Sequence, residues 1–295
     1  MLLGVFSGLA AALFQDCGYI LSRIYIKKRD CSWNLLVYTQ ILMGGVSLVL
    51  LPFLWTPAIW NDLFFLIPLF LSAYGSFFGQ RFFMRAEKHI EPARISSMMA
   101  LRVVLLAIVS ALFLGARYDW MQVAGILLAP IAAFLINWEN GRIRMGGMQW
   151  LGIALLFYCI SDLSVKYMID GIEVSNIFLA SLIAMCLVNI LLGFTMIPFV
   201  WKKWDWKEIP AAAPFAGSWF LKQFFLYACY ALIGPVHGNI ILSLRGPIAI
   251  ILTLILLRFH VQNLDNAAGA KIWIRRSIAT LMMLAAILLY TLNTK

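Results

Sequence analysis

Two arginines near the middle of long apolar runs are the residues of this chain best suited to chemistry. Arg102 lies in the apolar run 92–114, and Arg245 lies in the run 236–257. An arginine at the centre of a bilayer costs about 2.5–3.5 kcal/mol on insertion scales, so it is rarely kept without a use. Each guanidinium either grips a phosphate or carboxylate in a bidentate fork, or forms a structural ion pair with a buried acid or with backbone carbonyls.

Two acids lie inside apolar runs of their own and are candidates for coupling or ion pairing. Asp16 is the deep acid of the first half of the chain, and Asp162 is its less deep counterpart in the second half. One interpretation makes each carboxylate the counter-ion of an arginine. The other makes Asp16 a group that binds and releases a coupling proton, a role that intramembrane acids often have.

A third set of polar side chains makes the segment 211–233 unusually polar. Lys222, Gln223 and Tyr227 lie within it, and Gln80 lies at the matching place in the first half. A glutamine in lipid must find hydrogen-bond partners, so these side chains are expected to face a cavity or another helix. Two roles remain open for these side chains, namely binding of a substrate and hydrogen bonding between helices.

The composition places these residues in a membrane protein. Of 295 residues, 63% are hydrophobic and 12% are charged, whereas a soluble domain has about 25% charged residues. The run that starts at Met1 has no basic leader and is long enough to stay as a span, so no cleavable signal peptide is expected. The net charge of +10 is interpreted as a topology and lipid signal, and no nucleic-acid partner is predicted.

No motif predicts an enzyme or a bound cofactor. The five cysteines include no CxxC pair and the three histidines are scattered, so neither a metal site nor a cofactor is expected. A membrane enzyme would need clustered acids, histidines or serines at one interface. The best acidic pair, Glu87 and Glu91, lies beside basic residues in a connecting segment, where a solvated loop explains it.

Ten apolar segments predict an all-α integral membrane fold. Each is close to the length of about 20 residues that a helix needs to cross a bilayer, and helices satisfy the backbone of such a run in lipid. The expected transmembrane helices are 2–26, 34–54, 63–84, 92–114, 120–138, 148–169, 174–200, 211–233, 236–257 and 276–293. The tryptophans fall at or near these boundaries, with the exception of Trp219, as in an aromatic belt.

Basic residues are concentrated in the odd-numbered connections between these segments. The connections after the first, third, fifth, seventh and ninth segments carry most of the lysines and arginines, including Lys27, Lys28 and Arg29. By the positive-inside rule, these connections face the cytoplasm and both termini face outward.

A shift of 143 positions aligns the two halves of the chain without a gap across four segments. It places Gln80 on Gln223 and brings the two central arginines into register. Residues 1–143 and 144–295 are therefore expected to be two copies of a five-helix unit within one compact membrane domain. Because five is odd, the second copy must be inverted, and inverted repeats are typical of secondary transporters with a midplane substrate site.

Prolines at the start of the arginine-bearing segments also match. Pro92 aligns with Pro235, and together with Pro247 they are expected to shape helix starts or a kink. Arg94 and His237, each two residues after an aligned proline, are candidates to line one vestibule.

Three stretches carry a family resemblance. Residues 84–93, Met-Arg-Ala-Glu-Lys-His-Ile-Glu-Pro-Ala, with the sequence up to Gly115, resemble the segment A-L-x-x-x-x-P-A … L-x-L-G-E of the EamA-like members of the drug/metabolite transporter superfamily. Ala116 stands where that pattern has a glutamate. Residues 227–236 resemble a second copy of this segment, and residues 120–127, Trp-Met-Gln-Val-Ala-Gly-Ile-Leu, resemble the start of the family's fifth helix.

The resemblance implies a ten-helix transporter with helices 1, 3, 4, 6, 8 and 9 around a central cavity. It leaves the substrate open, since members carry amino acids, sugar phosphates, nucleotide sugars, choline, toxic cations or lipid-linked sugars. It also implies that both termini lie in the cytoplasm, which is opposite to the orientation that the charge pattern predicts. The expected location is the cytoplasmic membrane of a bacterium.

The leading prediction is a secondary transporter of a small organic metabolite with a phosphate or carboxylate group, working by alternating access. The predicted substrate-binding residues are Arg102, Arg245, Gln80, Gln223, Lys222 and Tyr227, and the predicted coupling or ion-pairing residues are Asp16 and Asp162. The alternatives are a proton-coupled exporter of cationic or aromatic compounds and a flippase for a polyprenyl-phosphate-linked sugar. Membrane lipids are the other expected partners, and duplication makes a monomer sufficient, although a homodimer is also compatible with it.

Overall fold

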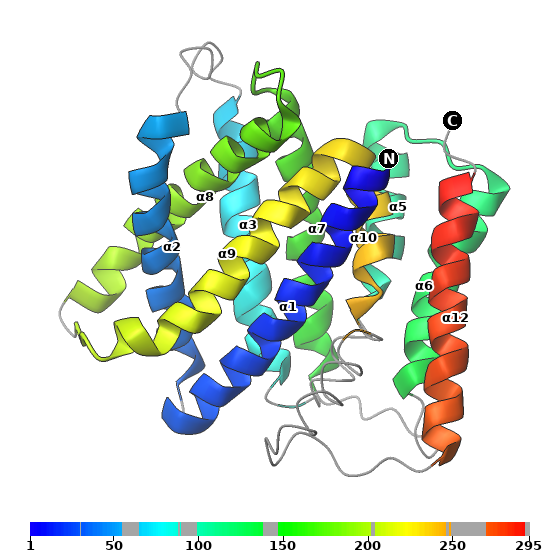
Figure 1. The fold of residues 1–295 in the computed structure, drawn as a ribbon, viewed down its shortest axis with the longest axis horizontal. Coiled ribbons are helices and arrows are strands. Elements are labelled where there is room, and N and C mark those ends of the chain that lie inside the picture. Colours follow the sequence, from blue (N-terminus) through cyan, green and yellow to red (C-terminus); the bar gives the residue numbers. More distant parts are fainter. Residues whose placement is uncertain are drawn as a thin grey trace.

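The protein is a bundle of helices in the computed structural model (Figure 1), which describes residues 1–29, 31–54, 65–87, 89, 99–137, 147–201, 204–245, 248 and 270–292. No strand occurs in these ranges. The helices are α1 (Leu2–Arg29), α2 (Ser32–Leu54), α3 (Leu66–Glu87), α5 (Leu101–Leu114), α6 (Trp120–Asn137), α7 (Met148–Asp170), α8 (Ile177–Val200), α9 (Glu208–Ile233), α10 (Pro235–Leu242) and α12 (Ala270–Leu292). The all-helical fold predicted from the sequence is confirmed for this part of the chain.

Four of these helices, α1, α2, α7 and α8, are long and apolar enough to cross a membrane. Shorter apolar stretches occupy α5, α6 and α12. Large hydrophobic side chains are exposed along the outer surface, among them Phe6, Phe53 and Phe113. In water such a surface would be unfavourable, whereas lipid solvates it, so these helices are those of a membrane protein.

Several helix boundaries differ from the predicted apolar segments by a few residues or more. α9 begins at Glu208 rather than at position 211, since an acid in the first turn interacts favourably with the helix dipole. α12 begins at Ala270 rather than at position 276 because a helix can continue past its apolar part into the polar interface. The start of the fourth predicted segment, with Pro92 and Arg94, and most of the ninth beyond position 245, with Pro247, lie outside the described residues.

Two glycines end helices at the same side of the bundle. Gly115 has φ 62°, a left-handed conformation, and its N–H bonds to the carbonyl of Ser110 at the end of α5. Gly234 has φ 80° and separates α9 from α10, whose first residue is Pro235. Glycine adopts positive φ without strain and proline suits the first turn of a helix, so Gly234 and Pro235 together make a sharp break between α9 and α10.

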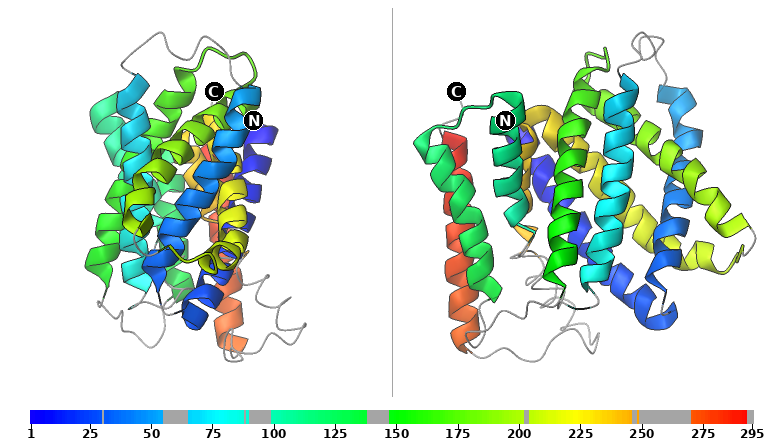
Figure 2. Two further views of the ribbon diagram at one scale, coloured as in Figure 1. Left: turned by 90° about the vertical axis from the view of Figure 1, so that its left-hand side faces the viewer. Right: turned by 180° about the vertical axis from the view of Figure 1, so that it is seen from behind.

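The helices pack mainly in four pairs. α1 lies against α9, α3 against α7, α2 against α8, and α6 against α12. Figures 1 and 2 show the α2/α8 pair at one end of the bundle and the α6/α12 pair at the other. The α1/α9 and α3/α7 pairs lie between them, so they form the walls of the middle of the bundle.

The α2/α8 pair is held at a close backbone contact between two glycines. A Cβ atom added to Gly44 would lie 2.8 Å from the carbonyl oxygen of Asn189 and 2.9 Å from the Cα of Gly193. The neighbouring Gly45 has open space at the same position. Small residues allow helices in a membrane to approach closely and gain van der Waals contact.

Gly44→Ala is expected to lower the thermal unfolding midpoint of the detergent-purified protein by several degrees. The added methyl group forces two backbones apart, and overpacking of this kind costs about 1–3 kcal/mol. Gly45→Ala is the matched control, because it makes the same chemical change one residue away and removes up to about 1 kcal/mol of helix-propensity cost. Equal midpoints for the two variants would contradict the close contact.

Candidate functional site

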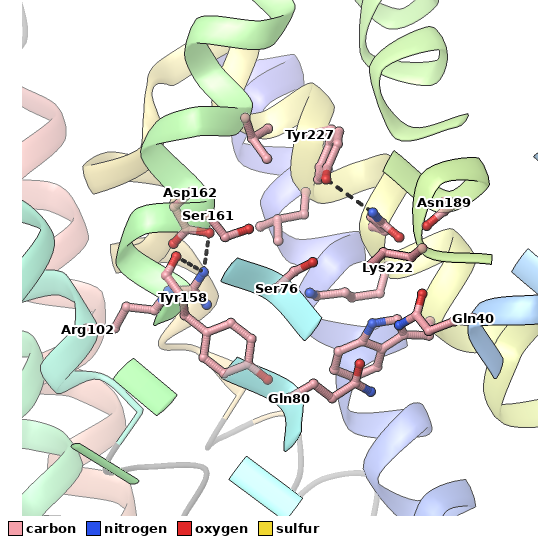
Figure 3. Close-up of a pocket in the computed structure, with 15 residues that line it drawn as sticks. Gln40, Ser76, Gln80, Arg102, Tyr158, Ser161, Asp162, Asn189, Lys222 and Tyr227 are labelled. Atoms are coloured by element: carbon pink, nitrogen blue, oxygen red, sulfur yellow. Dashed lines mark hydrogen bonds and ion pairs between the residues drawn. The ribbon is translucent and has the colours of Figure 1, made fainter. Parts of the chain in front are cut away.

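A small polar cavity lies in the middle of the bundle (Figure 3). Its volume is about 30 Å³, which holds roughly two water molecules at 10–15 Å³ each. Helices α2, α3, α5, α7, α8 and α9 line it with the side chains of Gln40, Ser76, Gln80, Arg102, Tyr158, Ser161, Asp162, Val165, Asn189, Leu192, Trp219, Lys222, Gln223, Leu226 and Tyr227. Most of these side chains are polar, so the cavity differs sharply from the apolar outer surface.

The cavity brings together most of the residues that the sequence singled out. Its lining includes five of the six predicted substrate-binding residues: Arg102, Gln80, Gln223, Lys222 and Tyr227. Of the two predicted coupling residues, Asp162 lines it. Arg245 and Asp16 are buried elsewhere among the described helices.

Arg102 is engaged by a carboxylate on another helix. Its Nη2 donates to Oδ1 of Asp162 on α7 in a short ion pair, and it also lies 3.2 Å from the carbonyl oxygen of Tyr158. The guanidinium carbon lies 4.7 Å from the centre of the Tyr158 ring. A buried guanidinium needs a partner of opposite charge and further hydrogen bonds. Of the two roles predicted for Arg102, this geometry matches the ion pair with a buried acid. The pair lies at the edge of the cavity.

The other oxygen of Asp162 extends the contact to a third and a fourth helix. Asn239 on α10 donates from Nδ2 to Asp162 Oδ2 over 2.9 Å, and the same nitrogen lies 2.8 Å from the hydroxyl of Tyr230 on α9. Asp162 therefore joins α5, α7, α9 and α10. Asn239 could not be singled out from the sequence, since its partner lies 77 positions away.

Asp16 and Arg245 are a second pair of opposite charges buried in the bundle. Asp16 on α1 is 2% exposed and Arg245, just beyond α10, is 3% exposed. The charge of Arg245 is near enough to act on the Asp16 carboxylate, whose two oxygens accept no hydrogen bond from the described residues. In low-dielectric surroundings such an attraction between opposite charges is much stronger than in water. Each central arginine thus has an acid on the first long helix of the other half of the chain.

Lys222 differs from both arginines. Its side chain is buried in the cavity, and its Nζ lies 4.5 Å from the centre of the Trp219 ring. No carboxylate of the described residues lies within salt-bridge distance of this ammonium group. The ring face offers partial compensation as a cation–π contact. Lys222 is thus a buried cation of the cavity that forms no salt bridge among the described residues, although the Asp162 carboxylate acts on it electrostatically.

One glutamine is fixed in a chain of hydrogen bonds. Gln223 donates from Nε2 to the Tyr227 hydroxyl over 3.1 Å, and this hydroxyl lies 3.3 Å from the Oγ of Ser72 on α3. Gln80 has a different setting, because its Nε2 is buried without a hydrogen-bond partner among the described residues. The two glutamines that match in the sequence are therefore held in different ways.

The sequence reasoning missed two carboxamides that line the cavity. Gln40 on α2 and Asn189 on α8 are 3% and 0% exposed. Each stands in a long apolar run. An isolated amide in such a run must satisfy its polar atoms inside the protein. The presence of an amide within an apolar run was therefore the sequence signal that pointed to these two residues.

Other predicted residues lie away from this cavity. His237 lines a second cavity of about 360 Å³ together with Lys166, Tyr118 and Tyr290, while Arg94 lies outside the described residues. Lys166 forms a salt bridge of 2.6 Å with Asp170. Within the described ranges no group of three metal-binding side chains occurs.

An enclosed polar cavity inside helices with apolar outer faces defines the class of protein. It is an integral membrane protein with an internal polar site. The model of the EamA-like transporter family, a family of the drug/metabolite transporter superfamily, matches residues 2–138, which confirms the resemblance predicted from the sequence. Members of that family are transporters rather than enzymes.

A solved structure supports the fold over nearly the whole chain. One crystal structure aligns with 98% of this chain and 96% of its own, with a TM-score of 0.66 and 15% sequence identity. At that identity the similarity concerns the fold alone. No curated protein matches the sequence.

Asp162→Ala is expected to destabilise the protein strongly. Removal of one partner of a buried ion pair leaves an uncompensated charge and costs about 3–5 kcal/mol. The control is Asp170→Ala, which breaks the exposed pair with Lys166 and costs about 0–1 kcal/mol. Thermal unfolding of both variants in detergent measures the difference.

A double variant separates loss of the pair from loss of packing. Arg102→Met combined with Asp162→Leu removes both charges and keeps the volume, so it should recover much of the midpoint lost by Asp162→Ala. A midpoint for Asp162→Ala equal to that of Asp170→Ala would show that the pair does not hold the helices.

Proposed function

We propose that this protein is a secondary transporter that carries a small organic metabolite with a phosphate or carboxylate group across a bacterial cytoplasmic membrane. The family match over residues 2–138 supports transport. The polar cavity supports a hydrophilic cargo, because polar side chains buried in a membrane bundle commonly mark a substrate path.

The proposed preference for an anionic cargo rests on the surroundings of Lys222. This lysine is buried in the cavity and makes no salt bridge within the described part of the chain. Arg102 forms a salt bridge with Asp162, so its charge is compensated, and Arg245 does not line the cavity. We therefore assign the primary anion contact to Lys222, and give Arg102 the role of positioning the cavity wall through Asp162.

The packing supports an organisation into ten spans as two inverted five-helix repeats, 1–143 and 144–295. Under the shift of 143 positions, α1 corresponds to α7 and α3 corresponds to α9. An exchange of the two halves therefore converts the α1/α9 pair into the α7/α3 pair, and both pairs occur.

Individual contacts follow the same exchange. Ser218 Oγ on α9 donates to the carbonyl oxygen of Phe14 on α1 over 2.7 Å. The matching residues are Gly75 on α3 and Phe157 on α7, and a Cβ on Gly75 would lie 3.0 Å from the Phe157 carbonyl oxygen. In the α1/α9 pair and in the α7/α3 pair, residues that match under the shift of 143 positions therefore meet at the corresponding backbone carbonyl.

The small volume of the cavity supports alternating access. A cavity of about 30 Å³ is far below the roughly 300–1,000 Å³ of sites that hold small organic ligands. Cargo therefore requires a rearrangement of the surrounding helices. We propose that the halves rock against each other around the site, with the α9–α10 break at Gly234 as one place where backbone angles change.

Lys222→Met is expected to weaken binding of an anionic cargo by about 10–100-fold, as a charged hydrogen bond contributes about 1.5–3 kcal/mol. Methionine keeps most of the side-chain volume. The measurement is the ligand-induced thermal shift of purified protein across a panel of amino acids, carboxylates and sugar phosphates, followed by uptake into proteoliposomes.

The matched control is Lys207→Met, which removes the same charge from an exposed lysine just before α9. It should leave binding unchanged. Affinity in Lys222→Met within twofold of the unmodified protein, for every anionic ligand that binds, would refute the assignment.

A further inference from the structure

Three carboxamide side chains in the cavity have polar atoms without hydrogen-bond partners in the part of the chain that the structure describes. They are Gln40 on α2, Gln80 on α3 and Asn189 on α8. Gln40 Oε1, Gln80 Nε2 and both polar atoms of Asn189 are buried and find no hydrogen-bond partner among the described residues. Figure 3 shows all three around the space beside Lys222.

This arrangement needs an explanation beyond packing. Native proteins pair nearly all of their buried polar groups, and an unpaired one is costly. These four unpaired carboxamide atoms come from three helices and line one space, whereas other buried atoms without partners among the described residues, such as those of Thr39 and Ser47, lie outside it. An apolar residue at any of the three carboxamide positions would avoid the cost of an unpaired amide. A shared ligand accounts for the convergence.

The chemistry of the amide group narrows the class of ligand. A carboxamide presents two donors and one acceptor and carries no charge. A hydroxyl group also donates and accepts, so several hydroxyl groups on one molecule complement several carboxamides. An alkyl chain of the same size would leave the amide atoms unpaired, which gives a site of this kind strong selectivity for hydroxylated ligands.

The other residues that line the cavity indicate the charge of the ligand and the kind of surface that packs against Trp219. Lys222 is the cation that makes no salt bridge within the described ranges, so one acidic group is matched. Trp219 presents an aromatic ring beside Lys222, and such a ring packs well against C–H groups. Gln223 and Tyr227, which already bond to each other, complete the polar side.

We propose that the carried substrate is a polyhydroxylated acid, with one acidic group on Lys222 and its hydroxyl groups on Gln40, Gln80 and Asn189. This inference rests on the proposed function, because it names the class of molecule that the anion transporter carries. It assigns Asn189 and Gln40 as specificity-determining residues.

The test uses pairs of ligands that share charge and chain length but differ in hydroxyl groups. Gluconate is compared with hexanoate, and glucose 6-phosphate with hexyl phosphate. Dissociation constants are measured by calorimetry on the full-length protein in detergent. The unmodified protein should bind the hydroxylated member of at least one pair about tenfold or more tightly.

Asn189→Leu removes the amide and keeps a similar volume. It should weaken the hydroxylated member about tenfold or more and leave the alkyl member within twofold. Gln122→Leu, on α6 and outside the cavity, is the matched control and should change neither. If Asn189→Leu does not fold, Gln80→Leu serves the same purpose from α3.

The outcomes separate this inference from the proposed function. Equal affinity within both pairs, with binding that depends on Lys222, overturns the polyhydroxylated class and leaves the anion transporter standing. Preference that survives both Asn189→Leu and Gln80→Leu also overturns it, since water alone would then satisfy the amides. Binding of no acidic ligand by the unmodified protein overturns the proposed function itself.

Discussion

A charge or amide buried in a lipid-embedded bundle must find its partner inside the protein, because the surrounding hydrocarbon supplies none. Arg102 illustrates the constraint, since its Nη2 donates to Asp162 and to the Tyr158 carbonyl, while its Nε has no partner among the described residues. Asp162 in turn accepts from Asn239, which also meets Tyr230. This one network fixes α5, α7, α9 and α10 relative to one another, so the wall of the cavity depends on it.

The same constraint divides the polar residues into two groups. One group is satisfied by the protein and serves to hold helices, as with Arg102 and Asp162. The other group consists of Gln40 Oε1 and both amide atoms of Asn189, which have no hydrogen-bond partner among the described residues, and of Lys222, which forms no salt bridge there. In a membrane the second condition is unfavourable unless something polar enters the cavity, which is why it points to a ligand more firmly than charge alone does.

Much of the helical framework could be predicted from the sequence, because the apolar runs are long and lipid leaves the backbone few alternatives. The partners of the central charges were less accessible. Arg102 pairs with Asp162, 60 positions away on another helix, and Asp16 does not match Asp162 in the repeat register. Gln40 and Asn189 have no amide counterparts under the shift of 143 positions, since Ile183 and Val46 stand there. Their convergence follows from how α2 crosses α8, which depends on packing and leaves no local pattern.

The crossing of α2 and α8 also bears on how a closed cavity can act on its cargo. Gln40 lies one turn before Gly44, and Asn189 lies one turn before Gly193, so both carboxamides are carried by the pair that the glycines hold together. Lys222 and Asp162 lie on α9 and α7, the helices that the Asp162–Asn239–Tyr230 network holds together. A rearrangement that moves the α2/α8 pair away from that network would separate the carboxamides from the cation. A ligand that reaches both would bind the closed form more tightly than the open one, and a conformational equilibrium shifts only through such a difference in affinity. A molecule that contacts only one group would bind both forms alike and would not favour closure.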